Sequence, residues 1–167
     1  MLSKFYPDHY VKSSFSINYE KLYKQGYRGI LFDIDNTLVK HGADANDEVV
    51  ELFKRLKSIG FKICLMSNNK LERVERFNKP IAVDFIYKAN KPFKKSYLEA
   101  MNRIHTNKSN TIFVGDQLFT DVWGAKRVGL RNYLVKPIDP KEEIQIVIKR
   151  YFERIVLYFY NKQSKIK

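Results

Sequence analysis

Two apolar segments of this chain each lead into a pair of aspartates. The first segment runs into Asp33 and Asp35, and the second, far along the chain, runs into Asp116 with Asp121 shortly behind it. Neighbouring carboxylates raise each other's pKa, so four of them can ionise in one place only if a cation offsets their repulsion. A hard divalent ion with oxygen ligands meets that need, and Mg²⁺ meets it best. The aspartates therefore predict a magnesium site, provided that the fold brings them together.

The elements that would position these aspartates are buried parallel strands. Short apolar runs alternate with amphipathic helices along the chain, which is typical of a parallel sheet covered on both faces. The expected strands are 30–34, 61–66, 83–87, 111–114 and 132–135, and the expected helices are 19–25, 47–59, 71–77, 94–104 and 121–128. Ligands of such sheets bind beyond the carboxyl ends of the strands. We therefore expect an α/β fold with a three-layer, Rossmann-like core of about five parallel strands.

The end of the chain adds a further element to this core. We expect residues 1–138 to form the core domain, with 1–28 as an aromatic lead-in, and residues 139–167 to form one long helix and tail. Seven basic and three acidic residues give the stretch 141–167 a net charge of +4. One helical stripe collects its apolar side chains: Ile144, Val147, Ile148, Tyr151, Ile155, Tyr158 and Phe159. A basic amphipathic helix of this kind can lie on an anionic membrane, but it could equally pack on the sheet or form a dimer contact.

Composition limits the classes of partner and the location. The 167 residues suit one domain, and a net charge of +13 favours anionic partners, although part of the lysine excess could be compositional bias. The lone cysteine, Cys64, lies in an apolar run and fits a packing role in a reducing compartment. No run has the length of a signal peptide core or a membrane span. These features predict a cytoplasmic protein, at the inner face of the membrane if the tail binds lipid.

The order of the motifs resembles the haloacid dehalogenase (HAD) superfamily. Asp33, Asp35 and Thr37 match its first motif, and the later motifs follow in sequence: Ser67 at the end of the second strand, Lys91 before Pro92, and Gly115-Asp116 with Asp121. The stretches Pro7–Ser13, Leu31–Val39 and Gly115–Asp121 further resemble the capless subfamily IIIA phosphatases, the family of YqeG-type bacterial proteins and mitochondrial phosphatidylglycerophosphate phosphatases. The resemblance implies a HAD-type phosphatase, which is an enzyme.

The resemblance also implies separate roles for the carboxylates. Asp33 would be the nucleophile that becomes an aspartyl phosphate, and Asp35 would be the general acid and base. Mg²⁺ would be held by Asp33, Asp116 and the backbone carbonyl of Asp35, with Asp121 supporting this set through water or hydrogen bonds. A purely structural alternative exists for several of them: Asp33 and Asp35 could cap a turn, and Asp121 could cap the helix that follows it.

Four further residues would bind the phosphoryl group by the same resemblance. Ser67 would donate its hydroxyl and Asn68 its backbone N–H, Lys91 would neutralise the developing charge, and Thr37 would assist. Structural alternatives remain here too, because Thr37 could be only a cap and Ser67 only a polar residue at the end of a strand. Lysines surround Lys91 in the sequence and could take its place: Lys88, Lys94 and Lys95.

The distances between the motifs bear on the substrate. HAD phosphatases usually carry a cap domain after the first or second motif, whereas here residues 38–47 and 68–91 leave no room for one. An open site suits a substrate too large or too immobile to be enclosed. The resemblance implies dephosphorylation of phosphatidylglycerophosphate to phosphatidylglycerol, so the expected partner is an anionic lipid head group, with peripheral membrane contact. Alternative substrates are a nucleotide, a nucleic-acid end or a phosphoprotein, of which nucleic acid is less favoured than the lipid. A non-catalytic binding role is a further alternative. The sequence leaves the oligomeric state open.

Overall fold

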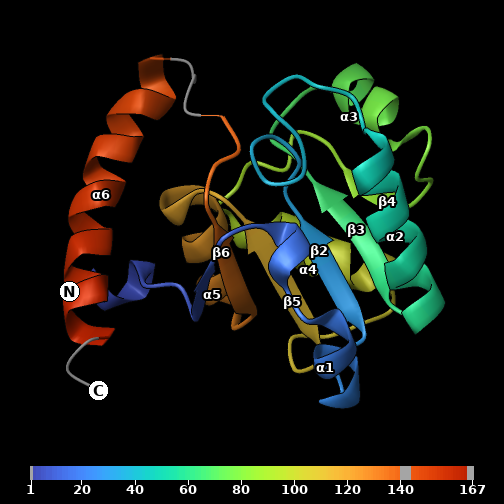
Figure 1. Cartoon of the computed structure of the whole chain (residues 1–167), viewed down its shortest axis with the longest axis horizontal. Helices are drawn as coiled ribbons and strands as arrows, with labels where there is room; N and C mark the ends of the chain where they lie inside the picture. Colours follow the sequence, from blue (N-terminus) through green and yellow to red (C-terminus); the bar gives the residue numbers. More distant parts are fainter. Residues whose placement is uncertain (1, 140–143, 165–167) are drawn as a thin grey trace.

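A six-stranded parallel sheet forms the centre of the computed structural model, which describes residues 2–139 and 144–164 (Figure 1). The strand order is β1-β6-β5-β2-β3-β4, and every neighbouring pair is parallel. The strands are β1 His9–Val11, β2 Gly29–Phe32, β3 Lys62–Met66, β4 Asp84–Ile86, β5 Thr111–Gly115 and β6 Arg131–Val135. The predicted α/β class is therefore confirmed.

The helices that connect these strands follow the predicted pattern closely. The described helices are α1 Tyr19–Lys24, α2 Asp47–Ile59, α3 Leu71–Asn78, α4 Lys94–Arg103, α5 Trp123–Val128 and α6 Ile144–Ser164, with short helical turns η1 Leu2–Phe5, η2 Ser14–Ser16 and η3 Leu118–Val122. One predicted helix, 121–128, is divided between the π-helical turn η3 and α5. Only a loop connects β2 to α2, and only α3 and short loops lie between β3 and β4, so the described chain has no cap domain.

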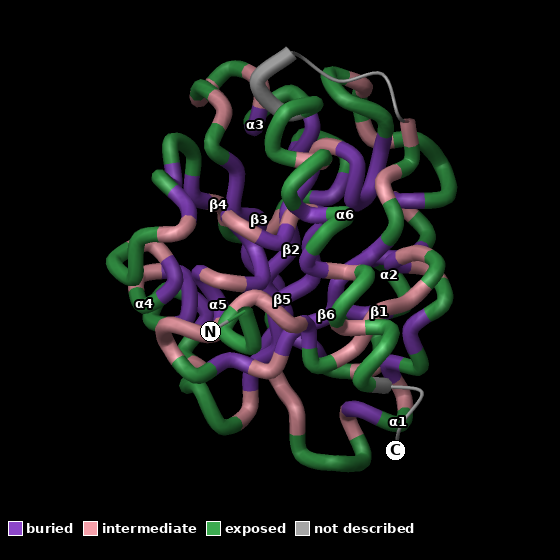
Figure 2. The backbone as a smooth tube through the Cα atoms, turned by 90° about the vertical axis from the view of Figure 1, so that its left-hand side faces the viewer, coloured by how far each residue is buried: buried purple, intermediate pink, exposed green. Residues whose placement is uncertain are grey.

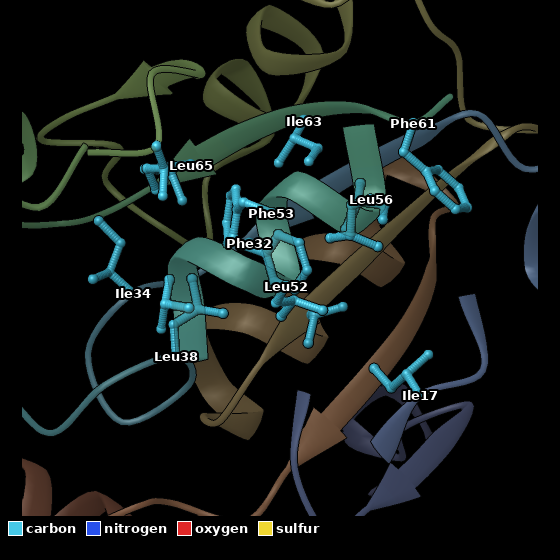
Figure 3. Packing of buried hydrophobic residues seen from close by; sticks show 14 of the residues in the cluster. Ile17, Phe32, Ile34, Leu38, Leu52, Phe53, Leu56, Phe61, Ile63 and Leu65 are labelled. Atoms are coloured by element: carbon cyan, nitrogen blue, oxygen red, sulfur yellow. The ribbon is translucent and has the colours of Figure 1, made fainter. Parts of the chain in front are cut away.

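Helices cover both faces of the sheet. Successive residues of a strand point to opposite faces, and here Phe32 packs with α1, α2 and α3 whereas Leu31 packs with α4 and α5. Figure 3 shows Phe53 and its neighbours on α2 packed against Phe32. The central strands are buried along their length (Figure 2), as expected for a parallel sheet with two covered faces. Cys64 is fully buried among these residues, as predicted.

The sixth strand, β1, was not predicted from the sequence. It has only three residues, lies in the aromatic lead-in, and forms one edge of the sheet by pairing with β6. Side chains fix its position, because the Asp8 carboxylate accepts hydrogen bonds from the backbone and the side chain of Asn132, at 3.0 and 2.8 Å. A strand that is held by residues far away in the sequence shows only a weak strand pattern in its own residues.

The last helix, α6, stands at one side of the molecule, next to η1 and η3 (Figure 1). The predicted helix is present but begins after residue 139; residues 140–143 and 165–167 lie outside the described part of the chain. Its docked face buries Glu153 and Val156, and Tyr160 meets Tyr6 with ring centroids 5.5 Å apart. Among the described helices, none has the length and hydropathy needed to cross a bilayer.

The apolar stripe of α6 points to solvent, which the sequence did not reveal. Six of its predicted members are at least 43 % exposed, namely Val147, Ile148, Tyr151, Ile155, Tyr158 and Phe159. The neighbouring Phe152 is exposed with them. The side chain of Ile144 lies outside the described part. The helix docks instead through a face that carries Arg150, Glu153 and Val156, because the two charged side chains find partners at the end of β5.

Candidate active site

The carboxyl ends of β2 and β5 bring the aspartates together. The two strands are neighbours in register, with Phe32 opposite Val114, and the backbone N–H of Asp33 donates to the Val114 carbonyl at 2.9 Å. Asp33 and Asp116 therefore leave the sheet side by side. Each of Asp33, Asp116 and Asp121 offers an oxygen, and these atoms lie within 4.8 Å of one another. All three residues are buried.

Asp121 reaches this cluster because the turn after β5 folds back over the end of the strand. One of its oxygens, Oδ2, accepts hydrogen bonds from the backbone N–H groups of Asp116 and Gln117, at 3.1 and 3.0 Å. The carboxylate lies against Gly115, where a Cβ atom would come within 2.5 Å of Asp121 Cγ. A glycine is needed at this position because any side chain would push Asp121 away.

Lys91 is the basic residue that the fold inserts among the carboxylates. Its Nζ lies 2.5 Å from Asp33 Oδ1 and 2.8 Å from Asp121 Oδ1, and its side chain is only 3 % exposed. Its backbone N–H donates to the side-chain oxygen of Asn68 at 2.9 Å. The structure thus brings Lys91, rather than the neighbouring lysines, to the predicted position.

Thr37 and Ser67 line the same group but differ in what they contact. The Thr37 hydroxyl lies 3.1 Å from Asp33 Oδ2 and 3.2 Å from Asp116 Oδ1, so it connects the ends of the two strands. Ser67 follows β3, and its hydroxyl oxygen accepts from the backbone N–H of Asn69 at 3.1 Å. Ser67 and Thr37 are both buried, at the places the motif order predicts.

The Asp35 side chain lies outside the three-carboxylate cluster. Its Oδ1 accepts from the backbone N–H of Gly42 at 2.7 Å and from Arg73 Nη2 at 2.9 Å, and its Oδ2 accepts from Asn69 Nδ2 at 2.7 Å. Two of these partners, Arg73 and Asn69, were not among the site residues predicted from the sequence. Lysine and arginine are common in this chain, and no local pattern distinguishes Arg73 from the rest.

Burial raises the pKa of the aspartates in this cluster. Burial, opposed by Lys91, raises the pKa of Asp33 to about 6. Burial and the nearby Asp33 carboxylate also raise the pKa of Asp116, which Arg150 opposes. For Lys91, burial lowers the pKa, but the carboxylates of Asp121 and Asp33 raise it by more, so the lysine keeps its charge. The three buried carboxylates of this cluster outnumber the one lysine that lies between them.

The second cation of the site comes from α6, and the sequence reasoning missed it. Arg150 forms a very short ion pair with Asp116 Oδ2, and its Nη1 donates to the Asp116 carbonyl at 2.6 Å. Glu153 pairs with Arg150 at 2.9 Å and accepts from the backbone N–H of Leu118 at 2.7 Å. The available signal was the spacing of two opposite charges, three residues apart on this amphipathic helix.

A cavity of about 370 Å³ lies between α6 and β6 and reaches Asp116. Apolar side chains form much of its wall, namely Leu134, Val135, Pro137, Val147 and Leu157. Arg150 and Arg154 add positive charge to the same wall. The cavity is therefore amphipathic and continuous with the carboxylate cluster.

A parallel sheet that carries buried aspartates at its carboxyl edge, with no cap, is the architecture of a capless HAD-type enzyme. A family model described as haloacid dehalogenase-like hydrolase matches residues 40–129. The probable phosphatase YqeG of Bacillus subtilis is 37% identical over 168 residues, which covers 99% of this chain and 98% of that protein. The chain belongs to the haloacid dehalogenase-like hydrolases. The prediction of a HAD-type phosphatase is confirmed by these two matches.

More distant proteins share the fold. A HAD subfamily III A hydrolase from Legionella pneumophila has a TM-score of 0.56 at 14% identity, covering 72% of each chain. The 3-deoxy-D-manno-octulosonate 8-phosphate phosphatase of Moraxella catarrhalis, solved with magnesium and phosphate, has a TM-score of 0.54 at 13% identity, covering 72% of this chain and 75% of that one. These likenesses show the architecture alone.

Proposed function

We propose that this protein is a Mg²⁺-dependent phosphomonoester hydrolase that works through an aspartyl phosphate on Asp33. We further propose that its substrate is phosphatidylglycerophosphate, which it converts to phosphatidylglycerol at an anionic membrane surface. The observation that carries the chemistry is the buried cluster of Asp33, Asp116 and Asp121 around Lys91. The lipid substrate follows from the family resemblance and is supported by the exposed apolar face of α6.

The donor set of the cluster fits Mg²⁺. Three buried carboxylates converge, and burial raises the pKa of Asp33 and of Asp116, so a cation between their oxygens would stabilise the charged forms. Asp33 and Asp116 would hold the ion, together with the backbone carbonyl of Asp35, and Asp121 would support them. When bound, the ion supplies positive charge for the transferring phosphoryl oxygens.

The chain's own residues account for the two halves of the reaction. An oxygen of Asp33 attacks phosphorus while the bond to the leaving oxygen breaks, and Asp35 gives its proton to that oxygen. Asp35 then takes a proton from water, the hydroxide attacks the same phosphorus, and the bond to Asp33 breaks to release phosphate. In the structure Asp35 accepts three hydrogen bonds, from Arg73, Asn69 and the Gly42 N–H, so both steps require its carboxyl group to turn from at least one of these donors toward the leaving oxygen.

Binding of the phosphoryl group falls to the neighbouring strand ends. We assign the Ser67 hydroxyl, the backbone N–H of Asn68 and the Lys91 ammonium to the phosphoryl oxygens. Thr37 orients Asp33 and Asp116 through its hydroxyl, so its part in phosphate binding would require that hydroxyl to turn. Arg150 and Lys91 together offset charge that the phosphate adds.

The outer face of α6 supports a substrate held in a membrane. Large apolar side chains point outward beside exposed basic residues such as Lys149, Arg154 and Lys162. Aromatic residues suit the interface of a bilayer, and basic residues suit its anionic surface. The same helix contacts Asp116, so a membrane bound by α6 would lie close to the site.

A phosphate-release panel tests both parts of the proposal. Purified protein with Mg²⁺ is offered phosphatidylglycerophosphate in mixed micelles, a nucleotide, a sugar phosphate, a 5′-phosphorylated oligonucleotide and a phosphopeptide. We expect the lipid to give the highest kcat/KM, and both Asp33→Asn and excess chelator to abolish release. Equal or faster hydrolysis of a soluble substrate would reject the lipid, and release that survives Asp33→Asn would reject the mechanism.

A further inference from the structure

Arg150 of α6 makes contacts that go beyond packing the helix against the core. It binds both the carboxylate and the backbone carbonyl of one residue, Asp116, and it is itself fixed by Glu153. Glu153 uses its other oxygen for the Leu118 N–H. The helix therefore holds the segment from Asp116 to Leu118 at three points.

The two oxygens of Asp116 have different partners. Oδ2 receives Arg150, whereas Oδ1 lies 3.2 Å from the Thr37 hydroxyl, which also meets Asp33. Arg150 thus occupies the Asp116 oxygen that Thr37 does not contact. A planar guanidinium that bonds to two acceptors of one residue limits the rotation of that side chain. Asp116 is held with Oδ1 beside the Thr37 hydroxyl, which links it to Asp33.

The formal charges indicate that Arg150 stays in place when the site is filled. Three carboxylates, Lys91, a divalent cation and a phosphate dianion together leave a formal charge of −2. The largely buried ion pair of Arg150 and Glu153 leaves this total unchanged, with the guanidinium placed between Glu153 and Asp116. Expelling the guanidinium would make a phosphate complex more negative, so we expect it to remain.

We propose that Arg150 is a positioning residue of the metal site, which fixes the Asp116 carboxylate in the orientation that binds the divalent cation. The proposal rests on the Mg²⁺ site of the proposed function, and it makes α6 a working part of the enzyme. Partners that orient ligand carboxylates typically contribute about 10- to 100-fold in metal affinity.

Calorimetric titration of MgCl₂ into the full chain without substrate tests the inference. Arg150→Gln is expected to weaken Mg²⁺ binding by about 10- to 100-fold. Arg150→Lys is expected to fall between it and the wild type, because an ammonium keeps the charge but not the two-bond geometry. Lys149→Gln removes the same charge from an exposed neighbour and serves as the matched control, with binding within about twofold of the wild type.

A second variant covers the case in which Arg150→Gln does not fold. Glu153→Gln keeps an oxygen for the Leu118 N–H but loses the ion pair with Arg150, so we expect a smaller loss of Mg²⁺ affinity. Mg²⁺ binding by Arg150→Gln that is as tight as or tighter than the wild type would overturn the inference. So would wild-type affinity of Arg150→Lys, because it would show that charge alone suffices without the two-bond geometry. Absence of phosphate release would refute the proposed function, and the titration would still measure the effect of Arg150 on Mg²⁺ affinity.

Discussion

Two cations reach one carboxylate cluster from opposite sides of the sheet, and they contact different members of it. Lys91 comes from the loop after β4, is almost fully buried, and contacts Asp33 and Asp121. Arg150 comes from α6 beside β6, with a side chain that is 13 % exposed, and contacts Asp116. The first cation belongs to the core on which the fold depends, and the second to a helix whose outer face meets solvent. Charge balance at one site therefore depends on two regions that differ in burial.

The largest expected effect comes from Lys91→Met, which removes the cation of the core. The substitution leaves the carboxylates of Asp33 and Asp121 buried without their partner, and breaking a buried pair in this way costs about 3–5 kcal/mol. Urea unfolding of the metal-free protein measures the loss. Lys95→Met, an exposed neighbour, is the control and should change stability by at most about 0.5 kcal/mol. Equal effects of the two substitutions would contradict the role of Lys91.

The acid dependence of stability should follow from the same region. The pKa of Asp33 is about 6 in the folded protein, against 3.8 for the free side chain, so the folded state binds more protons between these values. Stability then falls as the pH rises through this window, by on the order of 3 kcal/mol at most. Urea unfolding of metal-free protein at several pH values measures this slope.

Asp33→Asn provides the comparison for that slope. Asparagine does not titrate, so the fall in stability between pH 4 and about 6 should become shallower, and the raised pKa of Asp116 accounts for the part that remains. A wild-type stability that rises with pH throughout the window would show that Asp33 is not the group that holds the proton.

Local signals account for the elements that were predicted well. Helix α2 has the predicted bounds because Asn46 caps it, with its side chain accepting from the Val49 N–H at 3.0 Å, and Gly60 ends it at φ 108°. The paired acidic strand ends were predicted because parallel strands end at one edge. Both signals lie within a few residues of the feature they specify.

The features that were missed depend on contacts far apart in sequence. Strand β1 is held by Asp8 and Asn132, which are 124 residues apart. The docked face of α6 depends on where Arg150 and Glu153 find partners, and their spacing on the helix does not say which residues those partners are. Hydrophobicity identified the apolar stripe of this helix but not its direction, which the partners of the two charged side chains decide.

Gly115→Ala tests how tightly the core side of the site is packed. The added methyl group would meet Asp121 at 2.5 Å, so the aspartate must move away from the N–H groups of Asp116 and Gln117. We expect a loss of about 1–3 kcal/mol in unfolding free energy, together with weaker Mg²⁺ binding. The double variant with Asp121→Gly removes most of the clash, so its loss should be smaller than the sum of the single losses. Full additivity would contradict the proposed clash.

The smallest expected effect on stability comes from the outer face of α6. Phe152 is 55 % exposed, so Phe152→Ser should change the unfolding free energy by at most about 0.5 kcal/mol. Val156, on the docked face, is buried against Leu118 and Leu134, so Val156→Ser should cost several times more. If the outer face binds lipid, Phe152→Ser should reduce the fraction of protein that sediments with phosphatidylglycerol vesicles. Neutral phosphatidylcholine vesicles should bind both the wild type and Phe152→Ser weakly. Unchanged binding to the anionic vesicles would leave the exposed aromatic residues without a membrane role and would favour a soluble substrate for the same chemistry.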